Sequence, residues 1–250
     1  MSNDKEKLSV LGHLAELRKR LIRSLIVVAI TSILSFVFYE QIFDILIAPA
    51  PPGINLQAIE MTEMLGITMR VSLVSGIILA MPCLVYELII FISPALTRRE
   101  KRYVYLILPW VALMFAAGVA FGYFILIPRI TGFLISWGSN LVAIEPRIGS
   151  YINIVTRLLL SVGLVFEMPV VTTFLARIGV IKPKWLADKR KVAIICAFIL
   201  AAIITPTIDP INQTLVAMPL IVLYEMSIWL AKLVHRKEPR VVTHVSSPIS

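Results

Sequence analysis

The chain has 250 residues, 58% of them hydrophobic and 16% charged, with a mean hydropathy of +0.89 and a formal net charge of +9. Soluble domains contain about 45–50% apolar and about 25% charged residues, so this composition excludes an ordinary soluble domain and indicates an integral membrane protein. The apolar runs are continuous and do not alternate with a period of two, which argues against a transmembrane β-barrel.

Six apolar runs predict an all-α membrane protein with six transmembrane helices, and we expect residues 1–234 to form one membrane domain. The expected spans are 21–39, 65–93, 103–127, 151–178, 192–204 and 215–234. The fifth run is short, and a run of that length more often marks a re-entrant or buried segment. If it does cross the membrane, the bilayer must become thinner or admit water at that place.

Basic residues gather at the ends of these runs. Twenty of the 24 Lys and Arg residues fall in segments expected on one face, whereas the segments expected on the other face hold only Arg129 and Arg147. Because cytoplasmic loops carry the excess of basic residues, both termini are predicted to be cytoplasmic, in the inner membrane of the cell. The same placement at span ends disfavours nucleic-acid binding, and the basic tail 235–250 is expected to be disordered.

The segment before the first span is predicted to be an amphipathic helix. Leucines recur at helical spacing over residues 8–21, so we expect this segment to lie along the membrane surface before the chain turns inward. A plain anchoring helix is the alternative. Within it, HLAELRKRL (13–21) holds one carboxylate, Glu16, among bases, and TRREKR (97–102) likewise holds Glu100. If both stretches lie on one face, they can offer carboxylates to a cationic peptide.

Glu167 is the most distinctive single residue, because it lies near the middle of the fourth expected span, two residues before Pro169. An ionisable group at bilayer depth costs roughly 2.5 kcal/mol or more and indicates function by default. Two interpretations remain open: a hydrated polar patch on a concave face, or a carboxyl group bonded to neighbouring helices. The third span is expected to end before Pro128, followed by a loop with a short helix over 128–150.

The sequence contains no HExxH, GxSxG, P-loop or GxGxxG motif, and its three histidines lack metal-ligand spacing. We therefore expect no enzymatic activity, no cofactor and no metal.

Five motifs occur in a fixed order between these spans: HLAELRKRL, FISPAL followed by RREKR, FGYFILIP (121–128), VFEMP (165–169) and TP…DPINQ (205–213). Together they resemble the TatC family, the multi-spanning receptor subunits of the twin-arginine protein translocase. The resemblance covers about residues 8–234 and implies a fold like a cupped hand with two short final helices. Glu87 and Ile89 stand where many relatives have Gln and Trp.

The resemblance implies a binding site for signal peptides that carry paired arginines. The residues that match the family at this site are Glu16, Glu100, Arg18 and Phe91. Other matched positions are Pro49, Glu63, Tyr123 and Asp209 on the outer side and Glu167 within the membrane. A guanidinium meets a carboxylate through two parallel hydrogen bonds, which an ammonium cannot reproduce, so two glutamates can distinguish Arg-Arg from Lys-Lys.

The implied function is the export of folded precursor proteins, driven by the proton motive force. The implied partners are twin-arginine signal peptides, single-span TatA- or TatB-type subunits, other copies of the chain and membrane lipids, and not nucleic acid. The alternative is a proton-coupled small-solute transporter that uses Glu167.

Overall fold

The computed structural model describes residues 2–52, 54–92, 98–137, 145–205 and 209–234, and this part of the chain is almost entirely helical. Its helices are α1 (Ser2–Val37), α2 (Tyr39–Ile47), α3 (Glu63–Ile92), α4 (Arg98–Phe121), the π-helical turn η1 (Gly122–Leu126), α5 (Ile127–Ser136), α6 (Ile148–Phe166), α7 (Met168–Arg177), α8 (Pro183–Asp188), α9 (Arg190–Ile204) and α10 (Pro210–Val234).

Five helical stretches of the described chain are long and apolar enough to cross a membrane. They are Leu14–Val37, Glu63–Phe91, Leu108–Ser136, Ile148–Arg177 and Pro210–Val234. These stretches agree with the prediction of an all-α, multi-pass membrane protein. The fifth apolar run of the sequence forms α9, which has 15 residues. At 1.5 Å per residue α9 is about 22 Å long, shorter than the roughly 30 Å hydrocarbon core of a bilayer.

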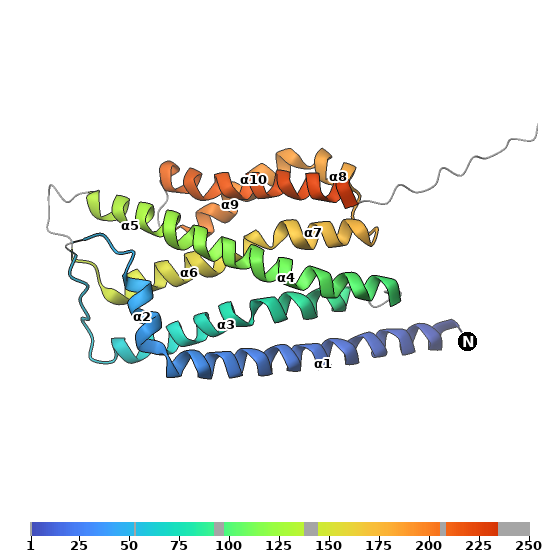
Figure 1. Cartoon of the computed structure of the whole chain (residues 1–250), viewed down its shortest axis with the longest axis horizontal. Helices are drawn as coiled ribbons and strands as arrows, with labels where there is room; N and C mark the ends of the chain where they lie inside the picture. The colour runs from blue at the N-terminus through green and yellow to red at the C-terminus, as the bar shows by residue number, and fades with distance from the viewer. Residues whose placement is uncertain (1, 53, 93–97, 138–144, 206–208, 235–250) are drawn as a thin grey trace, which may run out of the picture.

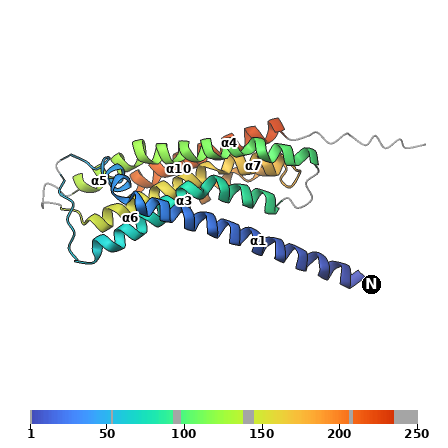
Figure 2. The same ribbon diagram turned by 60° about the horizontal axis from the view of Figure 1, so that its bottom comes forward.

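The long helices lie side by side in an elongated bundle, with α1 along α3 at one edge (Figure 1). A second view shows that α1 diverges from the bundle toward its N-terminus (Figure 2). The buried core is centred on α6, where Ile152, Val155 and Leu158 are completely buried. In contrast, α1 exposes Leu21 and Leu25 on its outer face, as expected of a helix surrounded largely by lipid.

A close helix crossing joins α1 to α3. A Cβ atom at Gly76 of α3 would lie 2.5 Å from the Cα atom of Ser32 in α1. At the same place the hydroxyl of Thr31 donates a hydrogen bond to the Gly76 carbonyl, with 2.8 Å between the oxygens. Small residues allow membrane helices to approach closely, so Gly76 determines how near α1 can lie to α3.

The structure corrects the prediction for the N-terminal segment. We expected residues 8–21 to lie on the membrane surface and then turn, but α1 is one uninterrupted helix of 36 residues. The stretch from Leu14 to Val37 contains neither glycine nor proline, so no residue in it favours a break where the turn was expected.

The predicted end of the third span is also wrong. The chain remains helical past Pro128, through η1 and α5 to Ser136. Pro128 falls in the first turn of α5, directly after the π-helical turn, where its missing N–H has little cost. The fourth span differs as well, because a break at Glu167 divides it into α6 and α7.

The last helix departs from the expectation of two short final helices. Only α9 is short, whereas α10 has 25 residues and begins at Pro210, five residues earlier than predicted. The helices α2 and α8 were not predicted. The expectation of disorder in the tail 235–250 lies outside the described residues.

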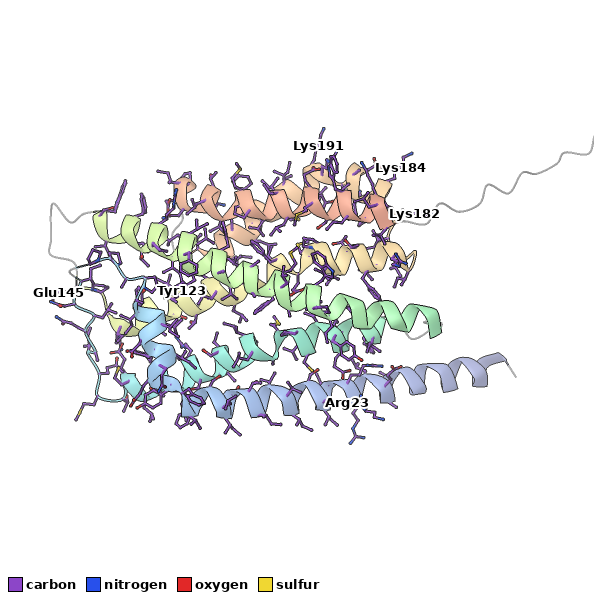
Figure 3. The ribbon with its side chains drawn as sticks, viewed as in Figure 1. Arg23, Tyr123, Glu145, Lys182, Lys184 and Lys191 are labelled. Carbon is purple, nitrogen blue, oxygen red and sulfur yellow. The ribbon has the colours of Figure 1, made fainter. Side chains whose placement is uncertain are left out.

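Basic side chains distinguish the two ends of the bundle. Arg23, Lys182, Lys184 and Lys191 lie in the half toward which the N-terminus of α1 points, whereas Glu145 lies at the opposite end (Figure 3). The last turn of α10, which contains Lys232, lies at the basic end too (Figure 1). The N-terminus of α1 and the C-terminus of α10 are therefore on the same side of the bundle.

Candidate functional site

At the basic end of the bundle, one arginine joins two carboxylates from different helices. Arg20 donates to Glu16 Oε1 from Nε at 3.1 Å and from Nη2 at 2.5 Å. Its third nitrogen, Nη1, donates to Glu87 Oε2 in α3 at 2.8 Å. Arg23 Nη1 lies 3.8 Å from the other Glu87 oxygen. We call these four residues the acid–base cluster.

The sequence explains the α1 part of this cluster. Glu16, Arg20 and Arg23 follow one another at steps of four and three residues, which places them on one face of α1. The close crossing at Gly76 holds that face against α3 and brings Glu87 within reach. Glu87 is almost buried, and a buried carboxylate needs a charged or hydrogen-bonding partner, which Arg20 provides.

Arg18 and Phe91, which the family resemblance matched to peptide binding, lie near this cluster in the chain. The Arg18 side chain is exposed and Phe91 is partly buried. Phe91 follows Glu87 by four residues in α3, so the two side chains share a helix face. Glu100 lies in the first turn of α4, which starts at the same end of the bundle as the N-terminal half of α1 (Figure 1). Its side chain is outside the described part of the structure.

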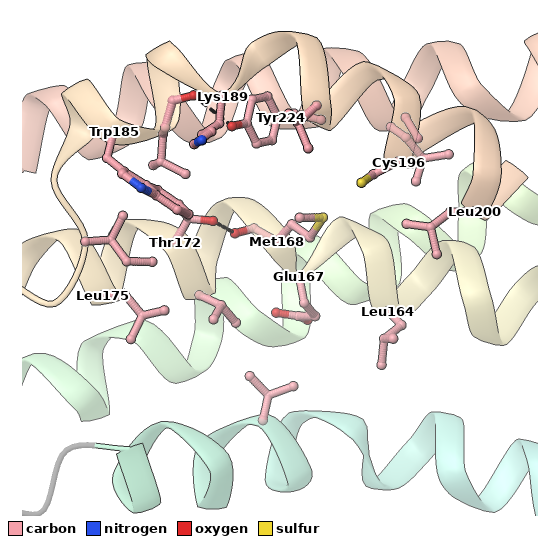
Figure 4. A pocket seen from close by; sticks show the side chains of 18 of the residues that line it. Leu164, Glu167, Met168, Thr172, Leu175, Trp185, Lys189, Cys196, Leu200 and Tyr224 are labelled. Carbon is pink, nitrogen blue, oxygen red and sulfur yellow. Dashed lines mark hydrogen bonds between the residues drawn. The ribbon is translucent and has the colours of Figure 1, made fainter.

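The second candidate site is the apolar cavity that contains Glu167 (Figure 4). The cavity has a volume of about 790 Å³ and opens between α7, α8, α9 and α10. Glu167 lies at the break between α6 and α7 and is 3% exposed. Within the described part of the chain, neither of its carboxyl oxygens has a hydrogen-bond partner. The structure therefore does not support the interpretation of a carboxyl group bonded to neighbouring helices.

At the opposite end of the bundle, Glu63 is a hydrogen-bond centre at the start of α3. Its Oε1 accepts from Arg147 Nε at 2.7 Å and from the Gly149 N–H at 3.2 Å, while Oε2 accepts from the Ile59 N–H at 2.8 Å. A Cβ atom at residue 149 would lie 2.6 Å from Oε1, so only glycine lets the backbone approach this closely. The carboxylates of Glu63 and Glu60 raise the pKa of Arg147.

Tyr123 and Tyr151 hold the C-terminal end of α2. The Tyr123 hydroxyl donates to the Ile45 carbonyl at 2.8 Å, and the Tyr151 hydroxyl donates to the Leu46 carbonyl at 3.1 Å. The last carbonyls of a helix lack partners within the helix, so both tyrosines satisfy groups that need one. Pro49 follows directly in the turn after α2 and is partly buried. Pro49 and Tyr123 thus both lie at the C-terminal end of α2.

Asp209 caps the N-terminus of α10. Its carboxylate accepts from the backbone N–H of Asn212 at 2.7 Å and from the Asn212 side-chain amide at 2.9 Å. Pro210 follows at the first helical position, which is the usual arrangement of a helix start.

The structure thus divides the expected site residues among three places. Glu16 belongs to the cluster at the basic end, Glu167 lies in the cavity, and Pro49, Glu63, Tyr123 and Asp209 lie at the ends of α2, α3 and α10. Sequence reasoning missed Arg20 and Glu87 as parts of the first site. The four-residue spacing of Glu16 and Arg20 could have indicated their pairing, but the partner of Glu87 depends on the helix crossing.

No group of three or more His, Cys, Asp or Glu side chains among the described residues could hold a metal ion.

Comparison with known proteins gives a consistent result. Residues 12–219 match the family described as TatC, Sec-independent protein translocase protein. The chain is 39% identical to the Sec-independent protein translocase protein TatC of Desulforapulum autotrophicum over 95% of this chain and 89% of that protein. It is 40% identical to the TatC protein of Aquifex aeolicus, over 92% of this chain and 97% of that protein.

The fold is similar to that of a solved protein as well. A crystal structure described as the twin arginine translocase receptor TatC superimposes with a TM-score of 0.80 at 40% sequence identity. The superposition covers 90% of this chain and all of the solved chain.

Proposed function

Because the chain belongs to the TatC family, whose members are translocase components and not enzymes, we propose that it is the receptor subunit of a twin-arginine translocase. In this role it binds the twin-arginine signal peptides of folded precursor proteins at the cytoplasmic face, for export across the inner membrane of the cell.

The observation that carries this proposal is the contact between Glu16 and a guanidinium. Two nitrogens of Arg20, Nε and Nη2, donate to the same oxygen of Glu16, Oε1, and this contact supports a role of the Glu16 carboxylate in accepting a guanidinium. The Glu16 side chain is 33% exposed, so a ligand can approach it from the surface. Glu100 then supplies the second carboxylate from the start of α4, and Arg18 and Phe91 complete the site.

The proposed topology has six crossings with both termini in the cytoplasm. α1, α3, α4 with α5, α6 with α7, and α10 account for five, and α9 is the sixth. The basic residues at one end of the bundle support this orientation by the positive-inside rule (Figure 3). The similarity to a solved TatC fold supports the expected arrangement of a cupped hand.

We further propose that single-span TatA- or TatB-type subunits and other copies of the chain are its partners. The apolar cavity around Glu167 provides a surface within the membrane for this assembly. Pro49, Glu63, Tyr123 and Asp209 act on the outer side, at the ends of α2, α3 and α10. The proton motive force drives transport.

The test is a double substitution, Glu16→Ala with Glu100→Ala, in the full-length protein. We expect it to abolish crosslinking of a twin-arginine peptide while the protein remains inserted in the membrane. Glu225→Ala is the matched control, because Glu225 is a half-exposed carboxylate paired with Arg190 at 2.7 Å and outside the proposed site. Undiminished crosslinking in the double variant would reject the assigned roles.

The alternative of a proton-coupled solute transporter is not favoured, because the similar proteins are named as protein translocase components. Export of a folded reporter with a twin-arginine signal, lost on deletion of the chain, separates the two functions. Uptake of a small solute by proteoliposomes would favour the transporter.

A further inference from the structure

The acid–base cluster contains as many guanidiniums as carboxylates. Arg20 binds both Glu16 and Glu87, and Arg23 approaches Glu87 from the other side. The two negative charges are thus already opposed by two positive charges from the same chain. A cationic peptide that approaches this cluster gains little from charge alone, because Arg18 and Lys19 lie beside it in α1.

The burial of the four side chains is unequal. Arg20 and Glu87 are largely buried, with side-chain exposures of 16% and 10%, whereas Glu16 and Arg23 are 33% and 55% exposed. A hollow of about 340 Å³ opens beside the cluster and is lined by Ala15, Glu16, Lys19, Arg20 and Arg23. The Arg20–Glu16 contact therefore borders an accessible space into which another side chain can enter.

From this geometry we infer that Arg20 is an internal competitor for the arginines of the signal peptide, and that Glu87 is a further carboxylate of the same site. The inference rests on the proposed function. In the free protein Arg20 occupies the position of a peptide arginine. Binding is then an exchange, in which a peptide guanidinium takes over the carboxylates as Arg20 withdraws from them.

The exchange explains how the site could select a pair of arginines over a pair of lysines. A peptide guanidinium offers the same fork of donors as Arg20 and can replace its bonds one for one. A lysine ammonium cannot, so it leaves part of the acid–base cluster unpaired when it displaces Arg20. Arg20 thus increases the selectivity of the site, because the free-energy cost of displacing it is larger for a peptide lysine than for a peptide arginine.

The position of Glu87 fits the second part of the inference. Glu87 and Phe91 share one face of α3, four residues apart, and Glu87 contacts the arginine that Glu16 binds. Glu87 therefore links Glu16 in α1 with Phe91 at the end of α3. A peptide arginine that replaces Arg20 would reach both carboxylates at once.

The test measures the affinity of the full-length protein in lipid nanodiscs for a labelled twin-arginine peptide and for its twin-lysine analogue. Arg20→Gln removes the competitor and retains both carboxylates, Glu16 and Glu87. We expect it to bind the twin-arginine peptide on the order of tenfold more tightly than the unchanged protein, with a smaller preference over twin-lysine. Adding Glu87→Gln to this variant should cancel most of the gain.

Two further variants keep the test decisive. Arg20→Lys retains the charge but not the fork, so it should fold and still bind the peptide several-fold more tightly than the unchanged protein. Glu225→Gln removes a carboxylate of a half-exposed ion pair outside the cluster and should leave the affinity unchanged. The thermal midpoint of each variant is measured alongside its affinity.

The outcomes separate this inference from the proposed function. If the unchanged protein does not prefer the twin-arginine peptide, the proposed function fails. If that preference is present, but Arg20→Gln and Arg20→Lys bind no more tightly than the unchanged protein at an unchanged thermal midpoint, Arg20 is a structural residue and the inference alone is overturned. An equal affinity of Arg20→Gln with and without Glu87→Gln would remove Glu87 from the site.

Discussion

The buried carboxylates of this chain differ in what they contact. Glu63 and Glu87 each accept hydrogen bonds from an arginine, and each joins helices that are distant in the sequence. Glu167 is buried more deeply still, but within the described residues its oxygens have no hydrogen-bond partner. A buried polar group without a partner lowers stability, so its presence in an apolar cavity indicates a role other than holding the fold together.

This difference predicts a gain of stability when Glu167 is replaced. Glu167→Leu substitutes an apolar side chain of similar size at a site where the carboxyl group gains nothing from its surroundings. An unsatisfied buried group costs about 1–3 kcal/mol, and we expect the free energy of unfolding to rise by an amount within that range. Export of a twin-arginine reporter should fall at the same time. The measurement is the thermal midpoint of the purified protein, together with reporter export.

Glu225→Leu is the control, because surface substitutions usually change stability by no more than about 0.5 kcal/mol. A lower thermal midpoint for Glu167→Leu would mean that the carboxyl group makes a stabilising contact in the membrane and that our assignment is incorrect.

At the scale of helices, packing depends on where backbones come close. Gly76 brings α3 against α1, and this crossing aligns the face of α1 that carries Glu16 and Arg20 with Glu87. The crossing lies about three helical turns from Glu87 along α3. A change there is therefore expected to act on the acid–base cluster through the position of the helix, without touching the cluster itself.

Gly76→Ala tests this dependence. The new Cβ atom would overlap the backbone of Ser32, so α1 must shift. Overpacking of this kind costs about 1–3 kcal/mol, although alanine is the better helix former. Gly66→Ala is a matched control in the same helix, because nothing lies within 4 Å of its added Cβ atom. We expect a lower thermal midpoint for Gly76→Ala alone, and equal midpoints in both variants would contradict the close crossing.

The bounds of the helices show how far the sequence could predict the structure. Long apolar runs predicted α3 and α6 with α7 to within a few residues, since a continuous apolar run of about 20 residues is typical of a helix long enough to span a bilayer. Pro128 misled the prediction, because a proline ends a regular helix but is tolerated after a π-helical turn. The sequence could not indicate that Arg20 reaches Glu87, because that contact depends on the angle and spacing of two helices.

At the scale of the whole molecule, the topology depends on whether α9 crosses the membrane. Its length of about 22 Å is too short for an undistorted bilayer. Polar groups gather near its C-terminal end: Arg157 of α6 donates to the Ile203 carbonyl, and Gln213 of α10 donates to the Phe198 carbonyl at 3.0 Å. An exposed arginine at this depth of α6 requires water or lipid headgroups nearby. We therefore expect a bilayer thin enough for α9 to cross.

Reporter fusions test whether α9 crosses the membrane, because one crossing more or fewer reverses the side of the membrane on which every later segment of the chain lies. With six crossings, a phosphatase that is active only outside the cytoplasm should be active when fused after residue 55 or Asp209. The same phosphatase should be inactive when fused after Asp188 or Val234. If α9 does not cross, the fusions after Asp209 and Val234 exchange their activities, while those after residue 55 and Asp188 keep theirs. The two earlier fusions are thus internal controls, and activity after Val234 would eliminate the arrangement with both termini in the cytoplasm.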